Sequence, residues 1–357
     1  MDGAGWTPYG NSLADAWDGF VLDHAWGRFI HLSGFKRAVE SVYGLKPEYW
    51  LHIRNNRIDA VFPSFHHRGL LSGKRLISQP FSEYGGILFA AGIGPGQRTE
   101  TLDGWKAVIE ALREKERFAH LEVRCFPDLQ GSRSEFLQKV RLHEYGILPL
   151  HKELDLEKKV DYSVRKNVRR AQESGLSVQF ENDEKTIRDI FYPLHLRSLK
   201  RLGSPPHPLA YFLRLRENLS GQLRILVARR GEVPVSALLG WTVGATVQIT
   251  DIVSDERFFL LRANDLLHFE FIRWAAAEDF RWFDFGPVRY PGQKQYKKKW
   301  GLEFHEYSHY YFPARGRKKP LSDQNRWARS GSAIWRTLVP RCLAARMGKC
   351  LRRELAI

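Results

Sequence analysis

Cysteine and long apolar runs are both scarce in this 357-residue chain. The three cysteines, Cys125, Cys342 and Cys350, are odd in number and widely scattered, so they support neither a disulfide framework nor a zinc ribbon. No stretch approaches the roughly 18 apolar residues that cross a bilayer, and the N-terminus lacks the basic and apolar segments of a signal peptide. We therefore expect a cytoplasmic protein whose membrane contact, if it has one, is peripheral and at the inner face.

Several common motifs are also missing. The chain has no serine-centred elbow, P-loop or dinucleotide-binding glycine motif. The glycine-rich segment from Gly92 to Glu100 lacks the ending of a P-loop and is predicted to form a surface turn. His305 and His309 fit the H-E-x-x-H pattern of zinc peptidases, which requires a helix. The aromatic residues around them favour a strand, in which the two histidines lie roughly 13 Å apart, so we expect no metal site.

Positive charge is in large excess. The chain has 56 Lys and Arg against 40 Asp and Glu, a net charge of +16. Such a chain is attracted to polyanions, which include nucleic acid, nucleotide-linked substrates and an acidic membrane face. The length exceeds that of a usual single core, so two packed domains are expected.

Two segments repeat one order of elements. Each begins with two apolar strands around a turn, at Asn55-Asn56 in the first and at Arg230-Gly231 in the second. A further strand, a helix (101–116 or 264–279) and a short strand follow. The helices carry apolar stripes, which are Trp105, Val108 and Leu112 in the first and Leu267, Phe271 and Trp274 in the second. This order indicates a diverged internal duplication, and two unrelated α/β domains are the alternative.

A basic helix is predicted between the two halves, over residues 161–175. Asp161 or Ser163 can cap its start, and Gly175 suits its end. The apolar side, which we expect to face inward, consists of Val164, Val168 and Ala171.

The outer faces of this helix carry columns of like charge. Arg165 stands one turn before Arg169, and Lys166 one turn before Arg170, which costs an isolated helix some tenths of a kcal/mol per pair. One interpretation is a solvated basic face. The other is a platform for phosphate groups, because nothing on the helix itself neutralises these charges and arginine suits bidentate phosphate contact.

The C-terminal region is polar from Pro313 and then alternates arginine with apolar residues. Pro340 is predicted to break it into two helical pieces. A basic amphipathic tail of this kind either covers the core of the first half or rests on an anionic membrane surface, and we expect it to pack on the first domain.

Three lysines stand between two aromatic residues in the segment Tyr296-Lys-Lys-Lys-Trp300-Gly301, shortly after the predicted strand Arg281–Gly286. This pair of motifs resembles the C-terminal signature of the FemAB-like acyltransferases, a branch of the GNAT superfamily with two GNAT-like domains in one chain. Further segments, over nearly the whole chain, resemble the same family, including members associated with exopolysaccharide and exosortase gene clusters; they are 17–44, 77–88, 163–178 and 334–348.

The resemblance implies an α/β (α+β) fold of two tandem GNAT-like domains, each a mixed central sheet flanked by helices. We expect the first domain at 1–150, the second at 151–312 and a basic helical tail at 313–357. It also implies an enzyme that forms an amide bond on an envelope precursor linked to a nucleotide or lipid, a peptidoglycan-like or exopolysaccharide-related acceptor. No bound cofactor or metal is expected, and the acyl donor, aminoacyl-tRNA or acyl-CoA, is a co-substrate.

Amide formation needs a neutral amine, stabilisation of the developing oxyanion and close placement of both substrates. The resemblance gives the second task to Lys297, with Tyr296 as its aromatic neighbour. We expect a Pro/Gly-rich loop before them, the aromatic residues to anchor the segment and Lys297 to point into a cleft. Lys298 and Lys299 are predicted to bind an anionic donor or acceptor, and a plain basic loop before the last strand is the alternative.

Asp251 is predicted to end a strand that lines the cleft, where it accepts the proton of the attacking amine or orients the amine. Capping of the next helix is the alternative. Acceptor binding at the domain junction, a common place for ligand sites, is predicted for two groups of residues, Arg165, Lys166 and Arg169 in one and Ser82, Glu83 and Tyr84 in the other.

One departure from the wider superfamily bears on the donor. GNAT enzymes hold the pyrophosphate of coenzyme A with a glycine-rich turn at the start of a helix. At the matching place this chain has residues 259–269, without glycine, which favours aminoacyl-tRNA or another acyl donor over acyl-CoA. The alternatives to this transferase are an N-acetyltransferase that uses acetyl-CoA on an amino sugar and a non-catalytic nucleic-acid-binding protein, which charge alone supports.

Overall fold

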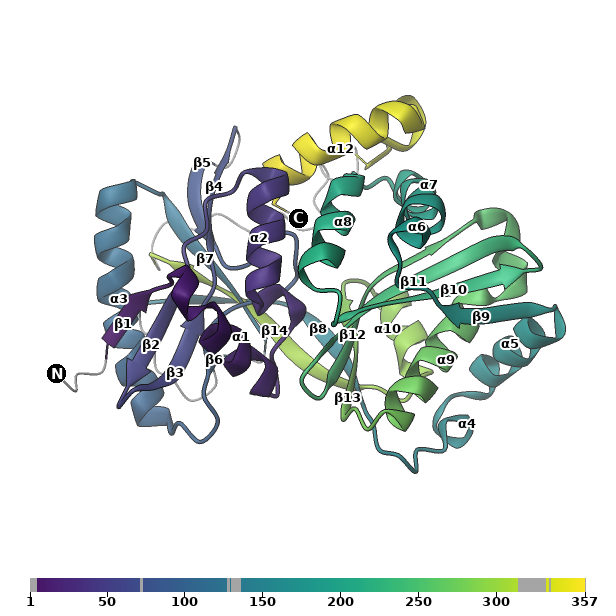
Figure 1. Ribbon diagram of the computed structural model, residues 1–357, viewed down its shortest axis with the longest axis horizontal. Helices are drawn as coiled ribbons and strands as arrows, with labels where there is room; N and C mark the ends of the chain where they lie inside the picture. The colour runs from purple at the N-terminus through teal and green to yellow at the C-terminus, as the bar shows by residue number, and fades with distance from the viewer. Residues whose placement is uncertain are drawn as a thin grey trace. The chain divides into compact units, whose positions relative to one another are not determined.

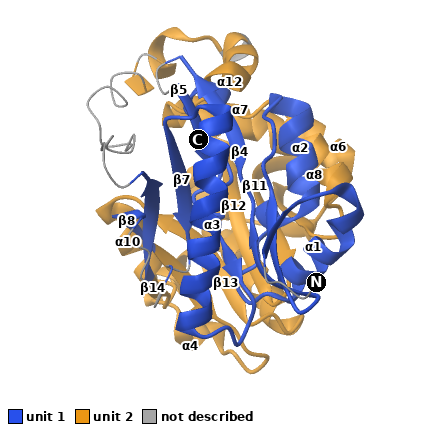
Figure 2. Cartoon of the chain, turned by 90° about the vertical axis from the view of Figure 1, so that its left-hand side faces the viewer, with its two compact units in different colours: residues 1–144, 305–318, 353–357 blue, residues 145–304, 319–352 orange. Residues whose placement is uncertain are grey.

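A computed structural model describes residues 5–70, 73–126, 129, 136–313, 332–333 and 335–356. The chain forms two compact units, which Figure 2 shows in different colours. Unit 1 comprises residues 1–144, 305–318 and 353–357, and unit 2 comprises residues 145–304 and 319–352. The sequence placed residues 151–312 in one domain. The structure groups 305–312 with unit 1 instead, because Ser308 to Phe312 pair with the strand Leu121–Cys125.

Unit 1 is a mixed α/β unit whose strands come largely from its first 150 residues. Its elements are β1 (Gly5–Pro8), α1 (Ala14–Asp23), α2 (Ser33–Tyr43), β2 (Trp50–Arg54), β3 (Arg57–Phe62), β4 (Phe65–Gly69), β5 (Gly73–Ile77), β6 (Leu88–Phe89), α3 (Pro95–Glu116) and β7 (His120–Cys125). The strands β8 (Gln138–Pro149) and β14 (Glu303–Phe312) run across the boundary in the sequence. Strands β1-β2-β3-β6 form one sheet, and β4-β5-β7-β14 are neighbours in another.

Unit 2 contains the strands β13-β12-β11-β10-β9 in that order, with β8 beside β13. Its elements are α4 (Leu156–Lys159), α5 (Tyr162–Glu173), β9 (Leu176–Phe180), α6 (Glu184–Thr186), η3 (Ile187–Phe191), α7 (Tyr192–Leu202), α8 (Leu209–Asn218), β10 (Leu223–Arg230), β11 (Val233–Val243), β12 (Thr246–Ser254), η4 (Glu256–Leu261), α9 (Ala263–Ala277), β13 (Trp282–Val288) and α10 (Pro291–Lys298). Helices α5 and α9 lie on one side of the strands, and α6 and α7 lie on the other (Figure 1).

Each unit contains a parallel strand pair. Strand β5 pairs with β7 in unit 1, and β12 pairs with β13 in unit 2. A long helix stands between the paired strands in the sequence, α3 in the first case and α9 in the second. Antiparallel partners lie beside these parallel pairs, β4 on β5 in unit 1 and β11 on β12 in unit 2, so the mixed strand pairing predicted from the sequence is confirmed.

Both predicted hairpins are present. Asn55 and Asn56 both have a positive φ, 49° and 58°, as a two-residue turn between twisted strands requires. In the second hairpin Arg230 still pairs with Val233, so the turn is Gly231-Glu232, one residue later than predicted, and Gly231 has a φ of 57°. The helix that follows the first hairpin is longer than expected, because α3 starts at Pro95. Part of the segment predicted as a surface turn is therefore the first turn of a helix, where proline is well suited.

The inward stripes of the predicted helices form the two cores. Trp105 of α3 is fully buried in unit 1, beside Phe62 at a ring separation of 4.6 Å. In unit 2, Leu267 and Phe271 of α9 are fully buried, and Val164 of α5 packs into the same cluster. Each such side chain contributes about 1.5–3 kcal/mol by burial.

The tail differs from the expectation that it packs on the first domain. Its helix α12 (Arg341–Leu355) begins directly after Pro340, so the predicted break is confirmed. Ala344 is buried, and a side chain on Gly348 would meet the carbonyl oxygen of Pro206 at 2.4 Å. Residues 319–352 thus group with unit 2, and residues 313–318 and 353–357 group with unit 1.

Candidate active site

The parallel strands of unit 2 stop pairing where the candidate site begins. The register joins Thr246 with Trp282, Val247 with Phe283 and Gln248 with Asp284, and goes no further although both strands continue. On the other edge of β12, Leu239 faces Asp251 while Gly240 faces Ile249, which leaves Thr250 as the extra residue of a bulge. A bulge bends its strand and redirects side chains, and it is over-represented beside active sites.

Lys297 sits at this place, with its ammonium group held by the backbone of β13. Its Nζ donates to the carbonyl oxygens of Phe285 (2.6 Å), Gly286 (2.8 Å) and Pro287 (2.8 Å). The side chain is 8% exposed. Gly286 has a φ of 71°, a conformation that favours glycine. The three ammonium protons therefore all point at main-chain oxygens.

Burial sets the acidity of this lysine. Desolvation lowers the pKa of Lys297, the Asp284 carboxylate opposes the fall and Arg289 adds to it, so that the pKa is about 8. At neutral pH Lys297 is therefore still mostly protonated, but a rise of one or two pH units removes its charge.

The segment that carries Lys297 is the helix α10, and the loop predicted before Tyr296 is helical from Pro291 onward. Pro291 occupies the start of this helix, after Tyr290 in an extended conformation. Trp300 is fully buried, and Tyr296 packs against the same core cluster. Two aromatic residues, one inside the helix and one just after its end, thus fix the helix that places Lys297, as expected of them.

Tyr296 also ties α10 to two other helices through a buried carboxylate. Its hydroxyl donates to Asp265 Oδ1 (3.1 Å), and Asn167 Nδ2 of α5 donates to Asp265 Oδ2 (3.0 Å). Asp265 is 6% exposed in the first turn of α9. Burial raises the pKa of Asp265 against the effect of these two donors. Sequence reasoning missed Asp265 and Asn167, because an acidic residue in a first helical turn is common for electrostatic reasons alone.

The basic helix α5 divides into engaged and exposed residues. Asp161 caps it by accepting from the backbone N–H of Ser163 (2.8 Å). Arg165 donates to the carbonyl oxygens of Glu157 (2.8 Å) and Val160 (2.7 Å). Its guanidinium therefore links α5 to α4 and to the residue that follows α4. Lys166 and Arg169 are exposed, and neither forms an ion pair within the part of the chain that the structure describes.

Lys298 and Lys299 are exposed at the end of α10. The carbonyl oxygen of Lys299 accepts from the backbone N–H of Asp161 (2.8 Å), so the end of α10 meets the start of α5. The structure therefore gathers exposed cations of α5 and α10 on unit 2. Ser82, Glu83 and Tyr84 lie in unit 1, and their role in acceptor binding stays a prediction.

Ser82 and Tyr84 have structural contacts of their own. Ser82 Oγ donates to the carbonyl oxygen of Tyr84 (2.7 Å), which closes a local turn. Tyr84 is 1% exposed, and its hydroxyl accepts from Arg28 Nε (3.4 Å). Glu83 is half-buried.

Asp251 lies within β12, three residues before its end, and not at the end as predicted. Its Oδ1 is 3.5 Å from Nδ1 of His195, which α7 carries and which is fully buried. The other ring nitrogen of His195 accepts from the backbone N–H of His207 (3.3 Å), so the proton of the neutral ring is on Nδ1 and faces Asp251. Burial raises the pKa of Asp251, but the neighbouring His195 outweighs this effect and the net shift is downward. Sequence reasoning missed His195, since nothing in the sequence links α7 to β12.

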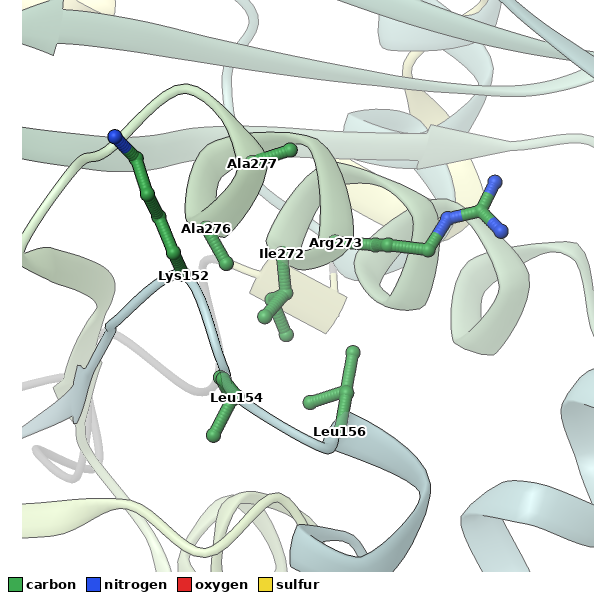
Figure 3. Close-up of a pocket in the computed structure, with 7 residues that line it drawn as sticks. All are labelled: Lys152, Leu154, Leu156, Ile272, Arg273, Ala276 and Ala277. Atoms are coloured by element: carbon green, nitrogen blue, oxygen red, sulfur yellow. The ribbon is translucent and has the colours of Figure 1, made fainter.

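A small cavity of about 160 Å³ opens elsewhere in unit 2 (Figure 3). Leu154, Leu156, Ile272 and Ala276 line it, with Lys152 and Arg273 beside them. Lys152 pairs with Asp279 and Arg273 with Glu270. Ligand pockets usually measure about 300–1,000 Å³, so this cavity is too small for a nucleotide or an acyl donor.

The H-E-x-x-H segment lies in the strand β14, as predicted. His309 is buried between Tyr307 and Tyr311, and burial lowers its pKa to about 3. In the described part of the chain no group of three histidine, cysteine or acidic side chains could hold a metal ion. Within the same residues, the helices are all too short or too polar to cross a bilayer.

A family model described as "Acetyltransferase (GNAT) domain" matches residues 158–298, which include Lys297, Asp251 and the helices around them. The curated proteins include no sequence that matches the chain.

Solved structures share the fold over most of the chain. A crystal structure of FemX covers 85% of this chain and 96% of its own, with a TM-score of 0.67 and 13% sequence identity. A tandem GNAT protein from the clavulanic acid biosynthesis pathway covers 88% of this chain and 100% of its own, with a TM-score of 0.55 and 12% sequence identity. The L-PGS structure from Bacillus licheniformis covers 74% of this chain and 83% of its own, with a TM-score of 0.52 and 11% sequence identity. Residues 158–298 therefore match a GNAT acetyltransferase domain, and the chain shares its fold with FemX and with the tandem GNAT protein.

Proposed function

We propose that the protein is an N-acyltransferase that joins the acyl group of an aminoacyl-tRNA, or of a related ester donor, to an amine of an envelope precursor or exopolysaccharide-related acceptor. The observation that carries this proposal is the buried ammonium group of Lys297, held by three carbonyl oxygens beside Gly286 at the place where β12 and β13 part. A fixed cation in a water-poor site is well suited to a developing oxyanion.

The reaction balances with the groups of unit 2. The amine lone pair forms the new C–N bond, and the electrons of the acyl carbonyl move onto its oxygen. Lys297 exchanges one of its carbonyl partners for this oxyanion. When the intermediate collapses, the ester C–O bond breaks and the leaving hydroxyl receives the proton that the amine loses. Asp251, kept ionised by His195, holds the incoming amine in this scheme.

Asp265 supports a donor other than acyl-CoA. In a GNAT enzyme that uses coenzyme A, free N–H groups at a helix start bind pyrophosphate. Here the carboxyl group of Asp265 occupies the first turn of α9. A pyrophosphate at this helix start would be repelled by the Asp265 carboxylate, or would bind only after that carboxylate took up a proton. The exposed cations of α5 and α10, Lys166, Arg169, Lys298 and Lys299, are the candidates for phosphate contact with the donor or acceptor.

The test is equilibrium binding of the purified protein to acetyl-CoA, aminoacyl-tRNA and the same tRNA uncharged, all at one physiological salt concentration. We expect aminoacyl-tRNA to bind more tightly than both. Tighter binding of acetyl-CoA would overturn the donor assignment and favour an acetyltransferase that acts on an amino sugar. Equal binding of charged and uncharged tRNA would indicate a nucleic-acid-binding protein without an acyl site.

A further inference from the structure

Four large apolar side chains of unit 2 are exposed on neighbouring segments. They come from the end of α7, from η4 and from the residues before α12. Their exposed fractions are 56% for Leu202, 40% for Phe259, 69% for Leu260 and 74% for Leu338. Single exposed apolar residues are ordinary, but a group of them marks an interaction surface.

Contacts of the end of α7 bring these three segments together. The guanidinium of Arg201 lies over the ring of Phe259, 5.0 Å from its centroid, which joins the end of α7 to η4. Lys200 Nζ donates to the carbonyl oxygens of Trp335 and Arg336, and a side chain on Gly203 would meet the carbonyl oxygen of Ser332 at 2.6 Å. The end of α7 therefore contacts both η4 and the segment that leads to Leu338.

The turn that presents Phe259 and Leu260 is rigidly held. Asp255 is 3% exposed, and its carboxylate accepts from the guanidinium groups of Arg197 and Arg257 and from the backbone N–H of Arg257 (3.1 Å). Arg262, in the left-handed conformation, ends η4. The two apolar side chains are thus fixed on the surface by a built turn.

Positive charge surrounds the exposed apolar side chains. The three segments, 200–203, 255–262 and 332–338, contain two acidic residues, Asp255 and Glu256. The basic residues of the same segments are Lys200, Arg201, Arg257, Arg262 and Arg336. Apolar side chains within a basic surround suit a surface that offers both a hydrocarbon boundary and anionic head groups.

We propose that this surface, the α7–η4 patch of Leu202, Phe259, Leu260, Leu338 and the surrounding arginines, docks the protein on an anionic lipid bilayer. Leu260 and Leu338 enter the boundary between head groups and acyl chains, and the arginines contact the head-group phosphates. Nucleic acid is the poorer occupant, because its phosphates would engage the arginines and leave the four apolar side chains in water. The docking needs neither substrate nor Lys297. It therefore goes beyond the proposed acyl transfer and can be tested independently of it.

The test is sedimentation of the full chain with vesicles of phosphatidylcholine that contain phosphatidylglycerol, compared with phosphatidylcholine alone. The variant is Leu260→Asp, and the matched control is Val233→Asp, which adds the same charge at a 49% exposed apolar residue of the β10–β11 turn. We expect the wild type to bind the anionic vesicles, Leu260→Asp to bind roughly tenfold more weakly and Val233→Asp to bind nearly as the wild type does.

Because Leu260 and Val233 are both exposed, thermal unfolding should show that both variants fold. Equal losses in both variants would overturn the proposal, since net charge alone would then explain binding. Absence of vesicle binding by the wild type would also overturn it. So would a Leu260→Asp variant that loses tRNA binding and keeps vesicle binding, because the patch would then be an RNA surface.

Discussion

At the scale of single residues, the protonation of Lys297 sets the behaviour of the candidate site. Its pKa of about 8 lies well below the usual value because the ammonium group is buried, while three carbonyl oxygens hold that group in place. The ammonium form is the one that stabilises an oxyanion. Catalysis is therefore expected below the pKa and is lost above it.

The acyl-transfer rate should fall as the pH rises through about 8. In Lys297→Arg the guanidinium keeps its charge far above this range, so the remaining activity should lack the fall. The measurement is the pH profile of kcat for both proteins between pH 6 and about 10. A wild-type rate that stays level or rises across pH 8, or an identical fall in Lys297→Arg, would show that another group controls the reaction.

At the scale of elements, the hydrogen bond from Tyr296 to Asp265 fixes α10 on α9. Tyr296→Phe removes a donor from a carboxyl group that is 6% exposed, which should cost about 1–3 kcal/mol of the free energy of unfolding. The control is Tyr290→Phe, because Tyr290 is 56% exposed and its loss of a hydroxyl should change stability by less than about 0.5 kcal/mol. Urea unfolding of both variants measures the difference, and equal stability of the two would remove Asp265 as the anchor of α10.

The predictable elements are those whose causes are local. Asn55-Asn56 and Gly231 specify tight turns by their own conformations, and the stripe Val164, Val168, Ala171 specifies the buried side of α5. The proline and glycine before Tyr296 predict a loop, yet residues 291–298 form a helix. Their helical state depends on Trp300 and on the bond between Tyr296 and Asp265, which are 31 residues apart. The position of His195 beside Asp251 depends on the contact between α7 and β12. No pattern in the sequence predicts that contact.

At the scale of the whole molecule, the last residues hold part of unit 1 through their backbone. The carbonyl oxygen of Arg353 accepts from His67 Nε2 (2.6 Å), that of Leu355 from Arg75 Nη2 (3.3 Å) and that of Ala356 from Arg124 Nη2 (3.3 Å). All three donors are buried. The sequence led us to expect the amphipathic pattern of the tail to decide its packing, yet here main-chain oxygens make the contact with unit 1.

Removal of residues 353–357 should therefore destabilise unit 1, since buried donors lose their acceptors. We expect the free energy of unfolding to fall by about 2–5 kcal/mol, measured by chemical denaturation. Arg346→Ala, at an exposed position of α12, serves as the control and should change little. A truncated chain as stable as the control would contradict this expectation, because water would then replace the tail carbonyl groups without a loss of stability.

The acyl-transfer account depends on Lys297 above all, and one measurement addresses it directly. Aminoacyl-tRNA with a labelled amino acid is incubated with an amine acceptor, such as an envelope-type peptide, and with the wild type, Lys297→Ala or the control Lys185→Ala, at an exposed lysine that pairs with Asp189. We predict that the wild type and Lys185→Ala transfer the label into an amide bond. Lys297→Ala, once thermal unfolding has shown that it folds, should transfer the label at least about a hundredfold more slowly. Transfer by Lys297→Ala at the wild-type rate would contradict the account.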